Sequence, residues 1–331
     1  MRQIYFFIAI LIFLNACGTK REYYQPSKIE NLPNTAKQIN GSIVDFNNNI
    51  AQLNNGSFID NNGNIIKFNL DKNYNIINAY QDEILTADDN GNFKIYNTKH
   101  EEIFSYKFNE SVVSASIDGD DIALILASNT LVYANKNLGI KFIQNLGTAY
   151  AQDSRFANPY FLNTIIIYPM LNGKLAIVNK SSLKVIREII VSSEEFFNNV
   201  IYLNIQDDKM IAATDQKIIV VTPNRTLYLN ENIKDVNVGN QEIFILTKDG
   251  RVIKTDLNLR KIDEIKFQFA LFSKSTFYDN FLYIFEKTGY LIKIDSNLKQ
   301  YNVYKFSDAV DKKSFMKNNQ FFYQNKVLQL N

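Results

Sequence analysis

Apolar and polar residues alternate along short segments of this chain from residue 41 onward. The segments occur in pairs, and a tight turn joins the two members of each pair. A period of two predicts β-strands that bury one face and expose the other. The turns contain Asn-Gly, Asp-Gly or Thr-Gly, because hairpin turns need residues that tolerate a positive φ. The clearest predicted hairpins span 82–97, 121–135, 163–179, 208–222, 241–256 and 280–295.

The hairpins recur with a nearly regular spacing. One turn residue per copy gives Gly63, Gly91, Asn129, Gly173, Asp215, Gly250, Gly289 and Asn325. The mean spacing is (325 − 63)/7, or 37.4 residues. A hairpin repeat near 40 residues is typical of an all-β fold, the β-propeller of four-stranded antiparallel blades, and strands such as 102–108 and 111–117 complete the four. Eight turns predict eight blades, whereas the short first gap of 28 residues leaves seven blades open.

Two other all-β folds fit this repeat less well. Eight regular hairpins are too many for one β-sandwich, and a period near 37 residues is too long for most β-helix turns. The predicted propeller spans residues 41–331, and its last blade has only the short strands 321–324 and 326–330. We expect residues 42–46 to supply the missing outer strand. Such pairing of N- and C-terminal strands would close the ring and remove open sheet edges.

The first residues predict export and a lipid anchor. Arg2 precedes an apolar run at 4–14, which is too short to cross a bilayer and is typical of a secretory signal. The run ends in Leu14-Asn15-Ala16-Cys17 and resembles the bacterial lipobox, which implies cleavage after residue 16 and acylation of Cys17. The alternative is an ordinary signal peptide with an incidental cysteine. Several acyl chains on one residue would anchor the chain stably in a membrane.

The segment after the predicted anchor is polar and lacks periodicity. We interpret residues 17–40 as the lipidated cysteine and a flexible tether, which would span roughly 26 Å. Gly18 follows the cysteine, and this resembles the sorting signal of lipoproteins that are delivered to the outer membrane. We therefore expect the propeller to be anchored there and to face the periplasm.

Composition narrows the chemistry that the body could perform. Lys and Arg number 36 and Asp and Glu 34, so no strong net field favours nucleic acid. Cys17 is the sole cysteine and His100 the sole histidine, which argues against a disulfide, a cysteine metal site and His-dependent catalysis. The acidic run 118–121 lacks the ligand spacing of a calcium loop, and the pairs at 88–89 and 207–208 fit turns. We expect no cofactor, no metal and no enzymatic activity.

A longer consensus follows four of the turns, at 91–108, 173–191, 250–267 and 289–306. It consists of Gly, a strand ending in Asn or Asp, a short polar turn and an apolar strand. This order resembles the PQQ-like repeat of quinoproteins. Ile or Phe stands where that family has a Trp between blades, and the chain has no Trp to stack on PQQ. The resemblance therefore covers the skeleton of the repeat.

A lipobox followed by PQQ-like repeats resembles the BamB family of outer-membrane assembly lipoproteins, most closely over residues 153–222. The resemblance implies a periplasmic scaffold that binds the POTRA domains of a BamA-like barrel-insertion protein and assists nascent outer-membrane proteins. It places the partner-binding residues in two loops, and the candidates are Asp153, Ser154, Arg155, Phe156, Glu194, Glu195, Phe196 and Phe197. Arginine beside aromatic residues is frequent in interface hot spots. The alternative is that the two Phe residues belong to the core of a blade and that the acids form a solvated turn.

Two further functions remain open from the sequence. A propeller could use its central funnel to bind a ligand or a substrate, which would require polar side chains that converge at one end of the channel. A surface-exposed lipoprotein could instead bind host or matrix proteins and have no role in assembly.

Overall fold

The computed structural model describes residues 22–32, 34–80, 82–150, 152–306 and 313–330. The predicted signal peptide at 1–16 and the predicted lipidation site, Cys17, lie outside these residues. The described part of the chain forms 32 β-strands in eight four-stranded antiparallel sheets. Among these residues, no helix could serve as a membrane span.

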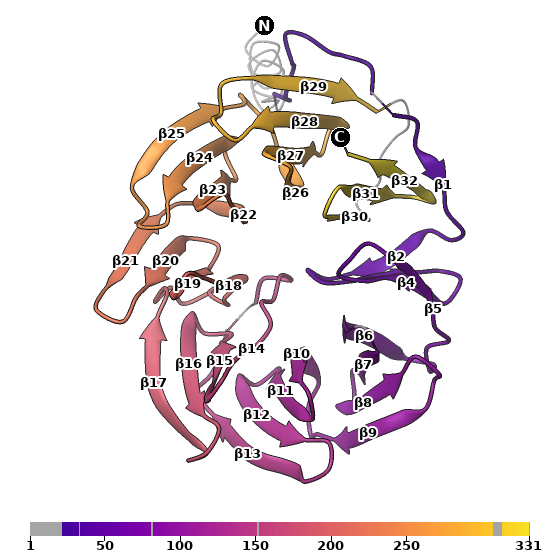
Figure 1. The fold of residues 1–331 in the computed structure, drawn as a ribbon, viewed down its shortest axis with the longest axis vertical. Helices are drawn as coiled ribbons and strands as arrows, with labels where there is room; N and C mark the ends of the chain where they lie inside the picture. Colours follow the sequence, from indigo (N-terminus) through magenta and orange to yellow (C-terminus); the bar gives the residue numbers. More distant parts are fainter. Residues whose placement is uncertain (1–21, 33, 81, 151, 307–312, 331) are drawn as a thin grey trace, which may run out of the picture.

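The eight sheets are the blades of a β-propeller, which Figure 1 shows as a ring viewed along its axis. Blades 1 to 3 consist of β2 (Ile43–Phe46), β3 (Ala51–Leu53), β4 (Ser57–Ile59) and β5 (Ile65–Lys67); β6 (Tyr74–Ala79), β7 (Glu83–Asp88), β8 (Asn92–Asn97) and β9 (Glu102–Lys107); β10 (Val112–Asp118), β11 (Asp121–Leu126), β12 (Thr130–Asn135) and β13 (Gly139–Asn145). In each blade the first strand lies innermost and the fourth outermost (Figure 1). The prediction of eight blades is confirmed.

Blades 4 to 7 repeat the same order of strands. They consist of β14 (Tyr160–Leu162), β15 (Ile165–Pro169), β16 (Lys174–Asn179) and β17 (Lys184–Ile190); β18 (Tyr202–Gln206), β19 (Lys209–Ala213), β20 (Lys217–Val221) and β21 (Thr226–Asn230); β22 (Ile233–Gly239), β23 (Glu242–Thr247), β24 (Arg251–Asp256) and β25 (Lys261–Lys266); β26 (Phe272–Tyr278), β27 (Phe281–Glu286), β28 (Tyr290–Asp295) and β29 (Tyr301–Lys305). Each predicted hairpin from 82–97 to 280–295 forms the two middle strands of a blade.

Blade 8 combines strands from the two ends of the propeller. It consists of β30 (Ser314–Lys317), β31 (Gln320–Tyr323), β32 (Lys326–Gln329) and, outermost, β1 (Lys37–Gln38), which pairs with β32. Closure by terminal strands is therefore confirmed, but the predicted closing strand was wrong. Residues 43–46 form β2, the innermost strand of blade 1. The sequence analysis included β1 in the tether, because a strand of two residues is too short to show an alternation of apolar and polar residues.

The predicted tether is also too long at its C-terminal end. Tyr24 is buried, and its ring meets those of Phe267 and Tyr290 edge-on, with centroids 6.0 and 5.7 Å apart. Glu30 forms a parallel bridge with Tyr304 of β29, and its backbone N–H donates to Val303 O at 2.8 Å. The described residues before β1 therefore pack along the outside of the ring, beside β29 (Figure 1).

The irregular first gap in the predicted repeat comes from a misassigned turn. Gly63 lies between β4 and β5, the third and fourth strands of blade 1, whereas the other turn residues lie between second and third strands. The equivalent residue is Gly56, between β3 and β4, and the distance to Gly91 is then 91 − 56 = 35 residues. Blade 1 has two Gly turns seven residues apart because β4 is only three residues long.

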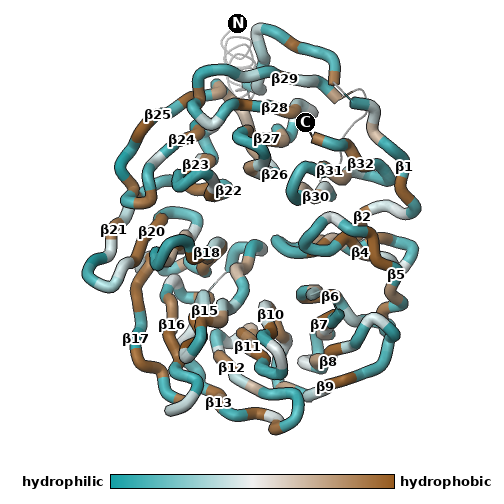
Figure 2. Tube along the Cα trace, viewed as in Figure 1, coloured by the Kyte–Doolittle hydropathy of each residue, from teal (hydrophilic) through white to brown (hydrophobic). Residues whose placement is uncertain are grey.

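The core lies between neighbouring blades. The second and third strands are buried on both faces, as in β11 and β12, because each blade packs between two others. The outer strands are mostly exposed, as in β9. Hydrophilic and hydrophobic stretches alternate around the whole ring in Figure 2. Aliphatic and phenyl side chains fill the interfaces, for example Leu85, Phe93 and Leu124 between blades 2 and 3.

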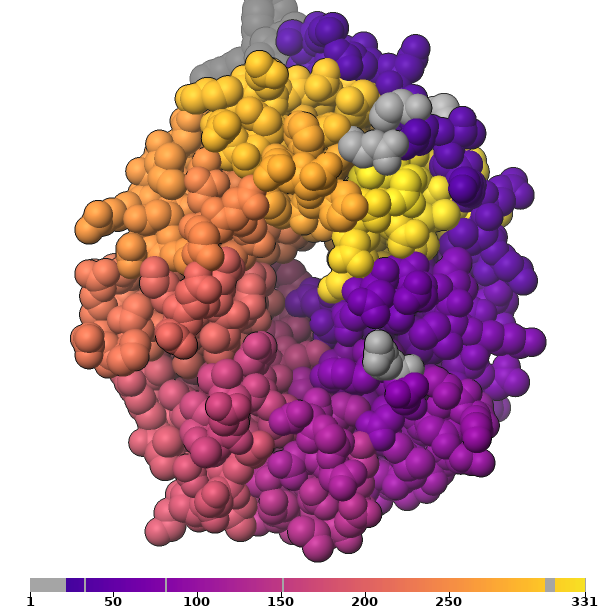
Figure 3. Space-filling view, in the orientation of Figure 1, coloured from indigo at the N-terminus to yellow at the C-terminus, as the bar shows by residue number. Residues whose placement is uncertain are grey.

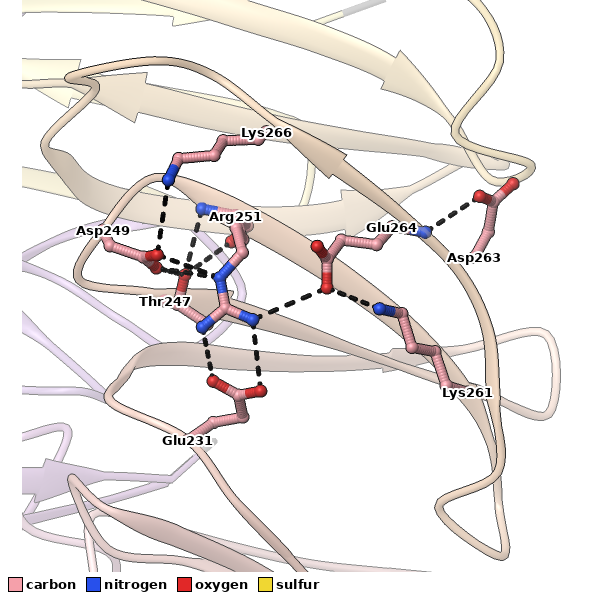
Figure 4. A network of polar contacts seen from close by, with 8 residues as sticks. All are labelled: Glu231, Thr247, Asp249, Arg251, Lys261, Asp263, Glu264 and Lys266. Atoms are coloured by element: carbon pink, nitrogen blue, oxygen red, sulfur yellow. Dashed lines mark hydrogen bonds and ion pairs between the residues drawn. The ribbon is translucent and has the colours of Figure 1, made fainter.

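One cluster of charges at blade 6 is satisfied within the fold. The Arg251 guanidinium contacts Glu231 at 2.6 Å, Asp249 at 3.0 Å and Glu264 at 3.5 Å, and Lys261 and Lys266 complete the network (Figure 4). These contacts link the connector between β21 and β22 to the β23–β24 turn and to β25. We interpret the network as a structural clamp, since its acids are matched by cations.

Candidate interaction surface and central channel

The antiparallel order of each blade divides its loops between two faces of the ring. The connectors between blades and the turns between second and third strands lie on one face, which we call the connector face. The turns between first and second strands, and between third and fourth strands, lie on the other. The two predicted partner-binding loops are neighbouring connectors: 146–159 joins β13 to β14, and 191–201 joins β17 to β18.

The first loop turns its charged residues toward the ring axis. Asp153, Arg155 and Phe156 line a central channel and are partly buried, whereas Ser154 is exposed. Arg155 forms an ion pair with Asp153 at 2.5 Å and donates to the backbone oxygen of Lys234 in blade 6 at 2.5 Å. Burial acts to raise the pKa of the Asp153 carboxyl, but hydrogen bonds from Arg155 outweigh it, and this pKa lies below its ordinary value.

A buried asparagine joins the two loops. The Asn199 Oδ1 accepts a hydrogen bond from the Asp153 backbone at 2.7 Å, and the Asn199 Nδ2 donates to Arg155 O at 2.6 Å. Asn199 has no exposed surface. A side chain on the second loop thus fixes the backbone of the first, and the structure brings together the two segments that the sequence nominated separately.

The second loop presents aromatic and acidic side chains to solvent. Phe196 is 51% exposed and Phe197 52%, and Glu194 and Glu195 are exposed beside them. Tyr150 of the first loop is 59% exposed, with its ring centroid 6.4 Å from that of Phe196. Phe197 has a φ of 52°, a conformation that bulky residues seldom adopt. We call these five residues the aromatic patch.

The eight nominated residues thus separate into two groups. Glu194, Glu195, Phe196 and Phe197 are on the exposed surface, and the alternative that the two Phe residues fill a blade core does not hold. Asp153, Ser154, Arg155 and Phe156 line the channel, where Asp153 and Arg155 pair with each other. Sequence reasoning missed Tyr150 and Asn199, because neither carries a local signal and both act through contacts between loops.

The residues that the sequence raised as candidates for catalysis or metal binding make contacts within the fold. The His100 ring stacks on Phe68 with centroids 4.7 Å apart, in the turn between β8 and β9. Asp88 accepts backbone hydrogen bonds from Asn90 and Asn92 within its turn. Asp121 accepts from Asn135 at 3.1 Å. Among the residues that the structure describes, no group of three or more His, Cys, Asp or Glu side chains could hold a metal ion.

Comparisons with known proteins give likeness at two levels. No protein-family model matches this chain. The plasminogen-binding protein PgbB of two Helicobacter pylori strains is 30% identical over 174 and 162 residues, which are 52% and 48% of this chain. These segments make up 32% and 30% of PgbB, so the chain spans about a third of the length of these curated relatives.

Solved structures resemble the chain in fold. BamB from Moraxella catarrhalis has a TM-score of 0.69 at 13% identity, over 89% of this chain and 100% of that one. The C-terminal WD40 domain of Sif2 has a TM-score of 0.66 at 12% identity, over 92% and 100%. The computationally designed protein Ika8 has a TM-score of 0.62 at 11% identity, over 89% and 98%. This chain therefore has the propeller fold of BamB, and about half of it is similar in sequence to part of PgbB.

Proposed function

We propose that this chain is a membrane-anchored, protein-binding scaffold that assists the assembly of outer-membrane β-barrel proteins as a BamB-like lipoprotein. The observation that carries the proposal is the aromatic patch. Exposed aromatic side chains beside charged ones are frequent at the centres of protein interfaces, and a propeller holds such loops on a rigid frame. The fold likeness to BamB and the lipobox-like motif at Cys17 support the same role. The scaffold acts through surface contacts and not through catalysis.

The partner in this proposal is a BamA-like barrel-insertion protein, bound through its POTRA domains. The test replaces both aromatic residues of the second loop, Phe196→Ser with Phe197→Ser, and measures capture of purified POTRA domains on the immobilised chain. We expect at least a tenfold loss of affinity, since a hot-spot residue contributes about 2 kcal/mol or more. The control is Tyr228→Ser on β21, which also replaces an exposed aromatic residue by serine, at a ring that is 67% exposed and far from the patch in sequence.

Three measurements decide the outcome of this test. Crosslinking in native cells followed by mass spectrometry must recover a protein that bears POTRA domains, and its absence would contradict the assembly role. If the double variant and the control capture POTRA domains equally well, the aromatic patch does not contribute to binding. Because Phe196 and Phe197 are about half exposed, the melting temperature of the double variant should stay close to that of the parent.

A second candidate function rests on the sequence similarity to PgbB, whose name describes plasminogen binding. In this alternative the propeller lies on the cell surface and binds a host protein. Binding of plasminogen to the purified chain, together with cleavage of the chain when intact cells are treated with protease, would favour the alternative. A chain protected on intact cells and inert toward plasminogen would favour the assembly role.

A further inference from the structure

The ring surrounds a central cavity of about 1200 Å³, somewhat larger than a typical small-molecule site of about 300–1,000 Å³. The innermost strands of the blades line it, and Figure 3 shows an opening near the centre of the ring. Asn48, in the β2–β3 turn, donates to Phe156 O at 3.0 Å and approaches Ile201 O at 3.4 Å. This side chain joins blade 1 to the connectors before blades 4 and 5, and it bounds one side of the cavity.

The lining of this cavity is rich in positive charge. It contains six cationic side chains and two carboxylates. Arg155 is paired with Asp153 in the lining, and Lys248 with Asp215 at 2.7 Å. Four lysines therefore face one remaining carboxylate, Asp235. The chain as a whole has a net charge of only +2, so this local excess is not a reflection of overall composition.

Three of the four lysines lie on the innermost strands of consecutive blades. Lys234 is in β22, Lys274 in β26 and Lys317 in β30. Within the described residues, none of their ammonium groups has a hydrogen-bond acceptor or a carboxylate at ion-pair distance. The Lys274 Nζ lies 4.0 Å from the centroid of the Phe46 ring, which is a weak substitute for a counter-ion. The nearby Asp235 carboxylate accepts instead from Ser275 Oγ at 2.6 Å.

Desolvated lysines without partners are unfavourable for the folded state. Burial lowers the pKa of Lys274 to about 8, and it lowers the pKa of Lys234 together with repulsion from Arg155. Burial also lowers the pKa of Lys317. A bound anion would restore the missing negative charge and reverse these shifts. Perturbed groups that converge on a cavity are a recognised mark of a binding site.

We propose that the central cavity binds a small multivalent oxyanion, a molecule with two or more phosphate or carboxylate groups, through Lys234, Lys274 and Lys317. The position of the three lysines on innermost strands, inside the ring, favours a small molecule over a polymer. The site is independent of the aromatic patch, which lies on exposed loops, so it would operate whichever protein the scaffold binds.

The test measures binding by calorimetry with the full chain in nonionic detergent, at low salt and without phosphate buffer. The two probes are tripolyphosphate and citrate, which separate phosphate from carboxylate ligands. The variants are Lys274→Met and Lys234→Met, which remove a charge and keep an apolar stem. The control is Lys67→Met, which makes the same change on the exposed outer strand β5.

We expect at least one probe to bind, with at least a tenfold loss of affinity in each cavity variant and less than a twofold loss in the control. Binding at pH 8 should take up a proton, seen as a heat that depends on the ionisation enthalpy of the buffer. The melting temperature of Lys274→Met without probe should be unchanged or higher, because an unpaired charge has been removed. A structural lysine would give the opposite result.

Two outcomes would overturn the proposal. One is the absence of binding by the parent chain to both probes at millimolar concentration. The other is an equal loss of affinity in Lys67→Met and in the cavity variants, which would show attraction by overall charge and not by the site.

Discussion

Gly91 turns the backbone between β7 and β8 with a φ of 84°, in a region where L-residues are strained. A Cβ at this position would lie 2.5 Å from Phe108 O and 2.6 Å from Glu110 O, both backbone atoms that cannot move aside easily. Gly119 also has a positive φ, of 57°, but has open space around it. An alanine at Gly119 would therefore have only the conformational strain of a positive φ, whereas an alanine at Gly91 would have that strain and a steric clash.

We expect Gly119→Ala to lower the free energy of unfolding by about 1 kcal/mol, the cost of a left-handed alanine. Gly91→Ala should lower it by about 1–3 kcal/mol more, because the added methyl group also overpacks the turn. Urea unfolding of the two variants under identical conditions measures the difference. Equal losses would mean that the carbonyls around Gly91 can relax, and that its role is conformational only.

Lys274 gives the stability of the protein a dependence on alkaline pH. Its pKa is about 8 in the folded state, because burial disfavours the charge, and ordinary in the unfolded chain. Between pH 8 and about 10.5 the unfolded state holds more protons than the native state, so the free energy of unfolding should rise with pH, by at most about 1.4 kcal/mol per pH unit. Below about pH 8 Lys274 is charged in both states, so its unfavourable contribution to the free energy of unfolding no longer changes with pH.

The Lys274→Met variant isolates this contribution. The neighbouring charges Asp235, Lys234 and Arg155 are present in both proteins, so the difference between the two stability profiles belongs largely to Lys274. We expect the variant to be more stable at pH 7 and the advantage to shrink toward pH 10. A constant difference over this range would contradict a lowered pKa.

At the scale of elements, β1 closes the ring with only two residues. It pairs Lys37 with Val327 and Gln38 with Lys326, and the following Ile39 N–H donates to Asn325 O at 2.8 Å. Without β1, the edge of β32 would be open to other chains.

Two truncations test the importance of β1. A chain that begins at residue 36 loses the contacts of Tyr24 and Glu30 but retains β1, whereas a chain that begins at residue 42 loses both. We expect the second to have a lower melting temperature and to scatter more light at equal concentration. Identical behaviour would show that blade 8 is stable with three strands, and that β1 covers it without supporting it.

The sequence predicted hairpins well because their signals are local. Period-two alternation and Gly or Asn at the turns locate β7–β8 through β27–β28. The burial of both faces of the second and third strands, as in β11 and β12, was not predicted, because it arises from the packing of each blade between two others. The place of a strand within the ring depends instead on closure between residues far apart. For this reason Gly63 was taken for Gly56, and residues 42–46 were placed at the outer edge of blade 8 and not at the centre of blade 1.

The candidate site shows the same division. Phe196 and Phe197 were nominated through the resemblance to the BamB family, and the mixture of aromatic and charged residues in the two loops supported that choice. The inward turn of Arg155 depends on Asp153, on Asn199 and on Lys234 O, three groups from different parts of the chain. The lysines of the cavity were not recognised because they come from three separate repeats, and only the ring brings them together.

At the scale of the whole molecule, the predicted lipid anchor and the fold set a limit on its position. Tyr24 is buried against blades 6 and 7, and 24 − 17 = 7 residues separate it from Cys17. Seven residues reach at most about 25 Å. An acylated Cys17 would therefore hold that side of the ring close to the bilayer, in contrast to the longer tether that the sequence predicted.

We expect Cys17→Ser to move the protein from the membrane fraction to the soluble fraction, because the acyl chains supply the attachment. Fractionation of cells that express the parent and the variant measures this change. The control is Tyr24→Ala, which should leave the protein with the membrane and only release the N-terminal segment from blades 6 and 7. A Cys17→Ser protein that stays with the membrane would contradict lipid anchoring.

Blade 8 combines strands from both ends of the propeller, and this determines when the ring can close during synthesis. Its outermost strand ends at Gln38 and its neighbour begins at Lys326, so 326 − 38 = 288 residues separate two segments that must meet. At about 5–20 residues per second of synthesis, roughly 15–60 s pass between the appearance of the first segment and that of the second. Until then β1 has no strand to pair with, and the ring of blades stays open. The ring can close only after residues 326–329 have been made, so its closure is a late step in folding.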